Sequence, residues 1–406
     1  MQIQKLLKRV KHWFPQAQEQ IKEQANELEA KLTDSHLDPL PPEKLRPIQE
    51  NLSQLPYPEP YIKAIAHKLN EHFSKWQQQK VCNCLVVLSH PTENISALLQ
   101  QTLAADVIDL SFPVNTLSWS HRPLDYSTIL SELQSQIHSK ETHSPQPQVQ
   151  VIPDLSWCFL RCLYGLDGIE WLQQTLFQDQ SQFWLIGCNH WMWHYLNHVY
   201  QWSTYFDQTL SLPSLEPLEI KQWLQPVSEK LSFDFDDDHD DLFESDEEDE
   251  EDSPWEGTAE RQYFKRLARI SLGIPPTVAQ LWLNSLQQQD AEEIEETSDA
   301  HISAESASRS ILLARVSVPK LPELTKEDRY LLFSIGLHGN LTLEQLALSL
   351  GNDTMLAALG ENPVVAQVQF LQRVGVIQNQ QGWLSIHPIH YPRLKIDLED
   401  NHFLVG

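Results

Sequence analysis

The sequence predicts an α/β fold built on a parallel sheet that helices cover on both faces. Apolar runs of strand length recur along the first half of the chain, and stretches of helical length separate them. Such an alternation is typical of parallel sheets. The 406 residues also suffice for two or three domains with cores of their own. The apolar runs cover residues 81–88, 106–112, 149–155, 183–189 and 208–212.

The first strand leads into a loop at which a nucleotide-binding protein would hold phosphate. A helical stretch over residues 95–103 follows the strand, so residues 89–94 connect the two. Phosphate-binding loops have the pattern G-x-x-x-x-G-K-[ST], in which glycines let backbone N–H groups turn inward and the lysine meets the phosphate charge. The corresponding positions in this chain are Ser89, Asn94, Ile95 and Ser96.

Three of these four positions depart from the pattern, and only Ser96 matches it. The first glycine of the chain is Gly165, far beyond the loop, and Ile95 replaces the lysine. Glu93 adds a negative charge where polyphosphate would lie. The sequence therefore predicts a phosphate-binding fold whose chemistry has been lost.

Two later strands carry polar residues that nucleotide hydrolases use. Asp154 stands near the end of the run 149–155, where a Walker B segment has its magnesium-directed carboxylate. Leu155 and Ser156 follow it, so the second acid that polarises the attacking water is absent. Asn189 closes the run 183–189 at the position of a sensor-1 asparagine. Binding residues are thus partly retained, whereas hydrolytic ones are missing.

The second half of the chain carries the elements of a lid and of a small C-terminal domain. Residues 262–286 are helical on either side of Gly273-Ile274-Pro275, which looks like the G-x-P turn of a STAND-type helical lid. The chain from about residue 324 onward resembles a winged helix, with helices over 326–337, 342–350 and 363–374 and a hairpin through 381–382.

In this order, residues 80 to 400 resemble the AAA+ and STAND superfamily of P-loop ATPases. The resemblance implies that Gly273 and Pro275 of the lid turn belong to the nucleotide site, together with the loop residues, Asp154 and Asn189. Because the phosphate loop departs from the family pattern, the family's activity is not carried over.

Acidic residues are concentrated in one block. Residues 234–252 hold nine Asp and five Glu, 14 acids in 19 positions, without Lys or Arg. Such a segment repels itself and buries little apolar area, which predicts a disordered insertion. The predicted segments are 1–60, an N-terminal helical segment with a Pro-rich linker; 61–225, a degenerate P-loop ATPase-like α/β domain; 226–257, the acidic insertion; 258–289, the helical lid; 290–323, an acidic linker; and 324–406, the winged-helix domain.

Composition restricts the partners and the compartment. The formal charge is −27, and removing the 14 acids of the block leaves −13, which disfavours nucleic acid as the main partner. The third helix of the predicted winged helix offers a single cation, Arg373. No run approaches the roughly 20 apolar residues that span a bilayer, and the N-terminus lacks an export signal. Five cysteines, an odd number, are expected to be reduced thiols, and we predict a cytoplasmic protein.

Histidines on one predicted helix raise a metal hypothesis. His190, His194 and His198 recur every four residues, a spacing that places imidazoles on one helix face. The same helix carries Trp191 and Trp193, and the usual paired Cys and His motifs of zinc sites are absent. A packed aromatic helix explains the pattern better, so we predict no metal site and no catalytic residue.

Two basic stripes are candidate interaction surfaces. Arg261, Lys265 and Arg269 follow the acidic block at helical spacing; they form either a solvated face or a surface that the acidic block covers. At the N-terminus, Lys5, Lys8 and Arg9 belong to a basic amphipathic helix. That helix is suited to a membrane surface, to a partner protein or to capping the core.

These observations favour a non-catalytic adaptor or regulator, a pseudo-ATPase that acts through protein contacts. No cofactor is expected. The first alternative is a nucleotide-binding switch that holds ATP and Mg²⁺ with weak or no hydrolysis. The second is a DNA-binding regulator that uses its winged helix. The sequence identifies neither the partner nor the oligomeric state.

Overall fold

The computed structural model describes residues 38–79, 82–105, 113–138, 148–206, 208–231, 233–235, 255, 257–288, 311–351 and 363–405. Three predictions lie outside these residues: the N-terminal basic helix with Lys5, Lys8 and Arg9, the apolar run 106–112, and the acidic block beyond Phe235.

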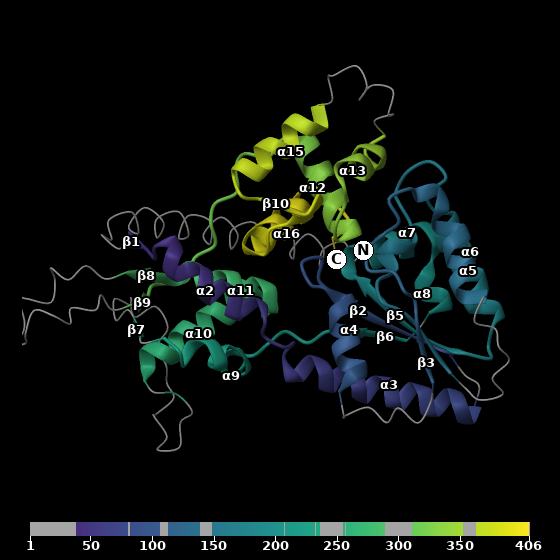
Figure 1. Ribbon diagram of the computed structural model, residues 1–406, viewed down its shortest axis with the longest axis horizontal. Helices are drawn as coiled ribbons and strands as arrows, with labels where there is room; N and C mark the ends of the chain where they lie inside the picture. Colours follow the sequence, from purple (N-terminus) through teal and green to yellow (C-terminus); the bar gives the residue numbers. More distant parts are fainter. Residues whose placement is uncertain are drawn as a thin grey trace, which may run out of the picture.

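A five-stranded parallel sheet forms the core of the first half, which confirms the predicted α/β fold (Figure 1). Its strand order is β3-β4-β5-β2-β6. The apolar runs supply four of these strands, and the edge strand β3 lies directly after the predicted run 106–112. The strands are β2 (Cys84–Ser89), β3 (Val114–Thr116), β4 (Val149–Ile152), β5 (Phe183–Asn189) and β6 (Thr209–Ser211).

Helices cover both faces of this sheet because successive residues of its buried strands point to opposite sides. Leu85 and Val87 of β2 pack in one apolar cluster with α3 (Glu59–Gln79) and α4 (Ile95–Ala104). Val86 and Leu88 pack in the other cluster, together with three helices of the opposite face. These helices are α5 (Ile129–His138), α6 (Asp167–Gln178) and α7 (His190–Tyr200). Burying each such side chain contributes about 1.5–3 kcal/mol.

A second, four-stranded sheet joins segments that are far apart in the sequence. Its order is β1-β8-β9-β7, from β1 (Asp38–Pro39), β8 (Leu286–Gln288), β9 (Ile311–Leu313) and β7 (Phe233–Phe235). Helices α9 (Pro217–Ser228), α10 (Thr258–Ser271), α11 (Pro275–Ser285) and α2 (Pro42–Ser53) pack beside it. The sequence does not reveal this sheet, because strands of two or three residues carry no periodicity.

Regular elements lie within three of the predicted segments. The expected Pro-rich linker before residue 60 contains α2, since a proline at the first helical position is compatible with a helix start. The expected acidic insertion over 226–257 contains the end of α9, at Ser228, and the whole of β7. The expected acidic linker over 290–323 contains β9.

The C-terminal elements follow the predicted order. The turn at Gln381 and Gly382 has positive φ at both residues, as two-residue hairpin turns require. One further helix, α16, lies outside the predicted set, and a proline marks its start. The elements are α12 (Lys326–His338), α13 (Leu343–Ser349), α15 (Pro363–Arg373), β10 (Ile377–Gln380), β11 (Trp383–Ile386) and α16 (Tyr391–Asp400). They lie against both sheet regions, through contacts of α12 with α7 and of the turn before α16 with α11 (Figure 1).

Candidate functional site

The loop after β2 lies at the position where parallel α/β sheets bind ligands. Strand β2 is flanked by β5 and β6, and the chain leaves it for the opposite edge of the sheet, so the strand order reverses there. Ligands of such sheets bind at the carboxyl ends of the strands next to this reversal. Ser89 pairs with Asn189 across β2 and β5, and Asp154 follows β4. The structure thus brings three sequence-predicted residues together at the carboxyl end of the sheet.

An internal carboxylate occupies the loop. Glu93 accepts a hydrogen bond from the backbone N–H of His90 at 2.6 Å, and its side chain is buried. Burial raises the pKa of Glu93 to about 7, and the bonds from His90 and Tyr61 offset part of that rise. A phosphate loop would turn such N–H groups toward its ligand. Here the chain supplies its own carboxyl group as the acceptor, a role that the sequence does not reveal because Glu93 there suggests only repulsion.

The other loop positions have structural roles. Asn94 is the N-cap of α4, where its side chain accepts the N–H of Ala97 at 3.1 Å. Ile95, in place of the lysine, is buried in the apolar cluster that contains α3. Ser96 is half-buried on the first turn of α4. The hydroxyl of Ser89 is buried and has no hydrogen-bond partner within the described part of the chain.

The C-terminal domain covers this loop. The hydroxyl of Tyr391, the first residue of α16, lies 3.2 Å from Nδ1 of His90. The ring of His90 is also 5.3 Å from that of His190. Tyr391 in turn stacks on Trp191 at 6.0 Å between ring centroids. No sequence motif marks His90 or Tyr391, because their meeting depends on the docking of two distant segments.

The side chain of Asp154 stabilises the turn that follows β4. Its carboxylate accepts the N–H of Ser156 at 2.8 Å and so caps the short helix Leu155–Cys158. Burial raises the pKa of Asp154 to about 6, against the opposing influence of Ser156 and of the Arg122 charge. A magnesium ion at this position would have to compete with the Ser156 N–H and with the Arg122 charge.

Buried Arg122 connects the parallel-sheet region to the C-terminal elements. It is 2% exposed, and burial lowers its pKa to about 10. On the sheet side, Nε donates to the carbonyls of Ser156 at 3.0 Å and Phe159 at 2.8 Å, and Nη2 donates to Ser156 at 2.6 Å. On the C-terminal side, Nη2 donates to the carbonyl of His338 at 3.2 Å, and Nη1 donates to that of Asn340 at 3.0 Å. The planar guanidinium matches these diverging acceptors.

Asn189 and His338 extend the same contact. The Asn189 side chain caps α7 through the N–H of Met192 and donates to the carbonyl of Leu337 at 3.1 Å. The buried His338 ring accepts the N–H of Arg161 at Nε2, so its Nδ1–H donates to Ser334. The side chain of Asn189 is therefore engaged in contacts with α12 and with its own helix.

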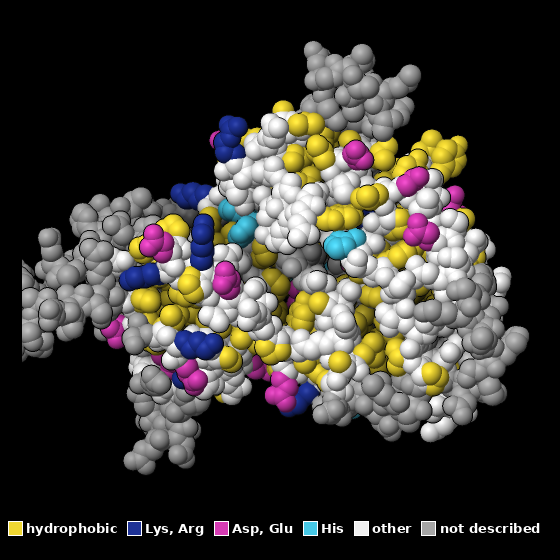
Figure 2. Space-filling view, in the orientation of Figure 1, with side chains coloured by type: hydrophobic (Ala, Val, Ile, Leu, Met, Phe, Trp, Pro, Cys, Tyr) yellow, Lys and Arg dark blue, Asp and Glu magenta, His cyan; other side chains and the backbone are white. Residues whose placement is uncertain are grey.

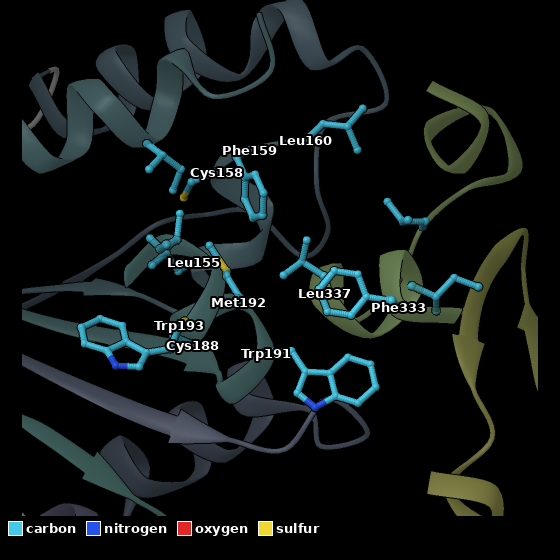
Figure 3. Packing of buried hydrophobic residues seen from close by; sticks show 14 of the residues in the cluster. Leu155, Cys158, Phe159, Leu160, Cys188, Trp191, Met192, Trp193, Phe333 and Leu337 are labelled. Atoms are coloured by element: carbon cyan, nitrogen blue, oxygen red, sulfur yellow. The ribbon is translucent and has the colours of Figure 1, made fainter. Parts of the chain in front are cut away.

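Apolar packing completes the interface between the domains. Figure 3 shows Phe333 and Leu337 of α12 reaching toward Trp191 and Met192 of α7. Trp191 is fully buried and stacks on Phe333 at 6.0 Å. Gly336 lies so close to this ring that a Cβ atom there would overlap it. Apolar packing therefore holds α12 against α7.

The lid turn has a packing role. Gly273 adopts φ of +65°, and a Cβ there would meet the backbone of Leu215, whose N–H donates to the Gly273 carbonyl at 3.0 Å. Pro275 is buried at the start of α11. Gly273 thus joins the turn between α10 and α11 to the segment that follows β6.

The predictions on metals and membranes can be compared with the structure only over the described residues. Within them, no group of three His, Cys, Asp or Glu side chains has the arrangement of a metal site. The helix with His190, His194 and His198 is α7, and its Trp191 and Trp193 are buried in the core. Across the same residues, no helix has both the length and the apolarity to span a bilayer.

Neutral histidines at the domain contact predict a pH dependence. Burial, together with His194 and Lys395, lowers the pKa of His190 to about 4. The unfolded chain then binds more protons than the native one below pH 6.5, so this histidine destabilises the fold as pH falls. We expect His190→Gln to resist acid better than the wild type, by about 1.4 kcal/mol per pH unit between about 6.5 and about 4.

Urea unfolding across this range measures the effect. The raised pKa values of Glu93 and Asp154 act with the opposite sign in part of the same window, because the native state then binds more protons. Their contribution is common to both proteins and cancels in the difference. Parallel pH curves for the wild type and His190→Gln would contradict this expectation.

Comparisons with known proteins leave the family open. No protein-family model matches the chain, and no curated protein matches it. Among solved structures, it is similar to Cdc6p from Pyrobaculum aerophilum (11% identity, 86% of this chain and 97% of that one, TM-score 0.35). It is also similar to RuvB from Thermotoga maritima (15%, 86% and 98%, 0.31) and to ORC1 from Aeropyrum pernix in complex with DNA (12%, 86% and 94%, 0.36).

Proposed function

We propose that the chain is a non-hydrolysing, AAA+/STAND-like protein with a C-terminal winged helix, which acts as an adaptor or regulator through protein contacts. The observation that carries the proposal is an internal acceptor: the Glu93 carboxyl group accepts a hydrogen bond from the backbone N–H of His90 in the loop where phosphate would bind. Asp154 and Asn189 are likewise engaged, in a cap and in the domain contact. At the same edge, the buried hydroxyl of Ser89 has no hydrogen-bond partner among the described residues.

Hydrolysis is the direct test of the catalytic half of the proposal. The chain lacks the loop lysine and an acid beside Asp154, so charge stabilisation and water activation are both missing. We expect no ATP turnover approaching about 1 per second. Phosphate release from purified full chain, with Asp154→Ala as the matched control, measures it. A turnover of that size that disappears in Asp154→Ala would refute the proposal.

The adaptor half is tested by capture from native lysate, with identification of partners by mass. The immobilised full chain should retain specific proteins in ATP-free buffer, and addition of ATP and Mg²⁺ should leave the set unchanged. Partners that are released by ATP would favour the switch alternative, for which the buried, unpartnered Ser89 hydroxyl is the supporting observation within the described residues.

A further inference from the structure

Helix α10 presents mainly positive charge to its surroundings. Its sequence contains Arg261, Lys265, Arg266 and Arg269. Its single acid, Glu260, is buried and binds Lys221 at 2.8 Å. In a chain of formal charge −27, this concentration of cations is unusual. Figure 2 shows most of the visible Lys and Arg side chains on the half of the molecule that holds α10 and α11.

Arg315 joins the same surface from the second sheet. It stands two residues beyond the end of β9, and Nε of Arg266 donates to the carbonyl of the next residue, Val316, at 2.8 Å. Burial and the charges of Arg315 and Arg269 lower the pKa of Arg266 to about 10. The fold thus holds Arg266, Arg269 and Arg315 near one another, a concentration of positive charge that suits an acidic ligand. We call Arg261, Lys265, Arg266, Arg269 and Arg315 the arginine surface.

The described residues that flank the acidic block, Phe235 and Trp255, both lie against α10. Strands β7 and β9 are parallel, with Phe235 opposite Leu313. The chain therefore leaves β7 in the same direction as the chain that leaves β9 toward Arg315. The residues after Phe235 are Asp236, Asp237 and Asp238. At the other end of the block, the Trp255 ring lies 5.9 Å from that of Phe264 on α10. Phe235 and Trp255 both contact Phe264, so the two ends of the block are anchored at the helix that carries four of the five cations.

We propose that the arginine surface binds the acidic segment 236–252 of the same chain. The segment offers 13 acids in 17 positions, and arginine pairs with carboxylates through two parallel hydrogen bonds. Tethering at both ends gives the segment a high effective concentration, which favours it over acidic partners in trans. This contact goes beyond the proposed function and holds whether or not nucleotide binds.

Cleavage of the segment by a Glu-specific protease tests the proposal in the full chain. Arg269→Gln/Arg315→Gln removes two cations and leaves the Arg266 bond to Val316 intact. We expect cleavage within 236–252 to accelerate about fivefold in this variant at low salt, and salt to abolish the difference. Lys63→Gln/Lys75→Gln, on the exposed face of α3, is the matched control and should cleave like the wild type. Equal rates in all three proteins would overturn the proposal.

A second measurement does not depend on cleavage. A chain that lacks residues 236–252 should bind a labelled synthetic peptide of that sequence, with affinity that falls about tenfold between about 50 and about 200 mM NaCl. The double Arg variant of the same chain should lose this binding. Tighter binding of duplex DNA than of the peptide would overturn the proposal and favour nucleic acid as the occupant. Absence of peptide binding in a cooperatively folded deletion chain would also overturn it.

Discussion

Replacement of Arg122 by Ala should lower the free energy of unfolding by about 3–5 kcal/mol, because it removes a buried cation that satisfies carbonyls on both domains. The variant leaves those carbonyls without their donor and leaves Asp154 without the nearby positive charge. Arg122→Lys should restore only part of the loss, since one ammonium cannot reach acceptors that diverge in several directions.

Urea unfolding followed by tryptophan fluorescence measures this effect. Arg46→Ala is the matched control, because Arg46 is exposed on α2 and a surface change of this kind stays within about 0.5 kcal/mol. A cost below about 1 kcal/mol for Arg122→Ala would show that the domains do not depend on this contact.

Replacement of Trp191 by Ala should cost a similar amount, about 3–5 kcal/mol, through the cavity left between Phe333 and Tyr391. Phe177→Ala is the control, because that ring is 65% exposed. The loss should also separate the melting of the C-terminal domain from that of the parallel sheet, since the ring joins the two.

A double-mutant cycle sharpens this prediction. Gly336→Ala should destabilise the wild type by about 1–3 kcal/mol, because its methyl group overlaps the Trp191 ring. In the Trp191→Ala background the same methyl group enters a cavity and should cost much less. Additive effects of the two changes would contradict the close approach of α12 to α7.

The parallel sheet could be predicted from the sequence because its strands are long apolar runs with helices between them. The run 183–189 is strand β5 over its whole length, and the helix after the loop begins at Ile95 as expected. The second sheet could not be predicted. Its strands β1, β7, β8 and β9 are two or three residues long, and their partners are distant in the sequence.

The sequence predicts which positions form the site but not the contacts that these residues make. Ser89, Asp154 and Asn189 do meet at one edge of the sheet, as a motif-based search indicates. Arg122 and Tyr391 reach this end of the sheet through tertiary docking, and both come from segments without any motif. Glu93 acts instead through a bond inside its own loop. The absence of glycine and lysine predicts an altered phosphate loop. It does not predict the hydrogen bond from the His90 N–H to Glu93.

The proposed function requires that side chains of the chain itself occupy the carboxyl end of the sheet, where an ATPase binds nucleotide. Thermal unfolding of the full chain with and without ATP and Mg²⁺ measures whether they do, with Asp154→Asn studied in parallel. If Kd exceeds about 1 mM, about 1 mM nucleotide stabilises by at most about 0.4 kcal/mol, a shift of about 1 °C or less. We expect this small shift in both proteins. A rise of several degrees in the wild type that Asp154→Asn abolishes would show instead that the edge is open to nucleotide.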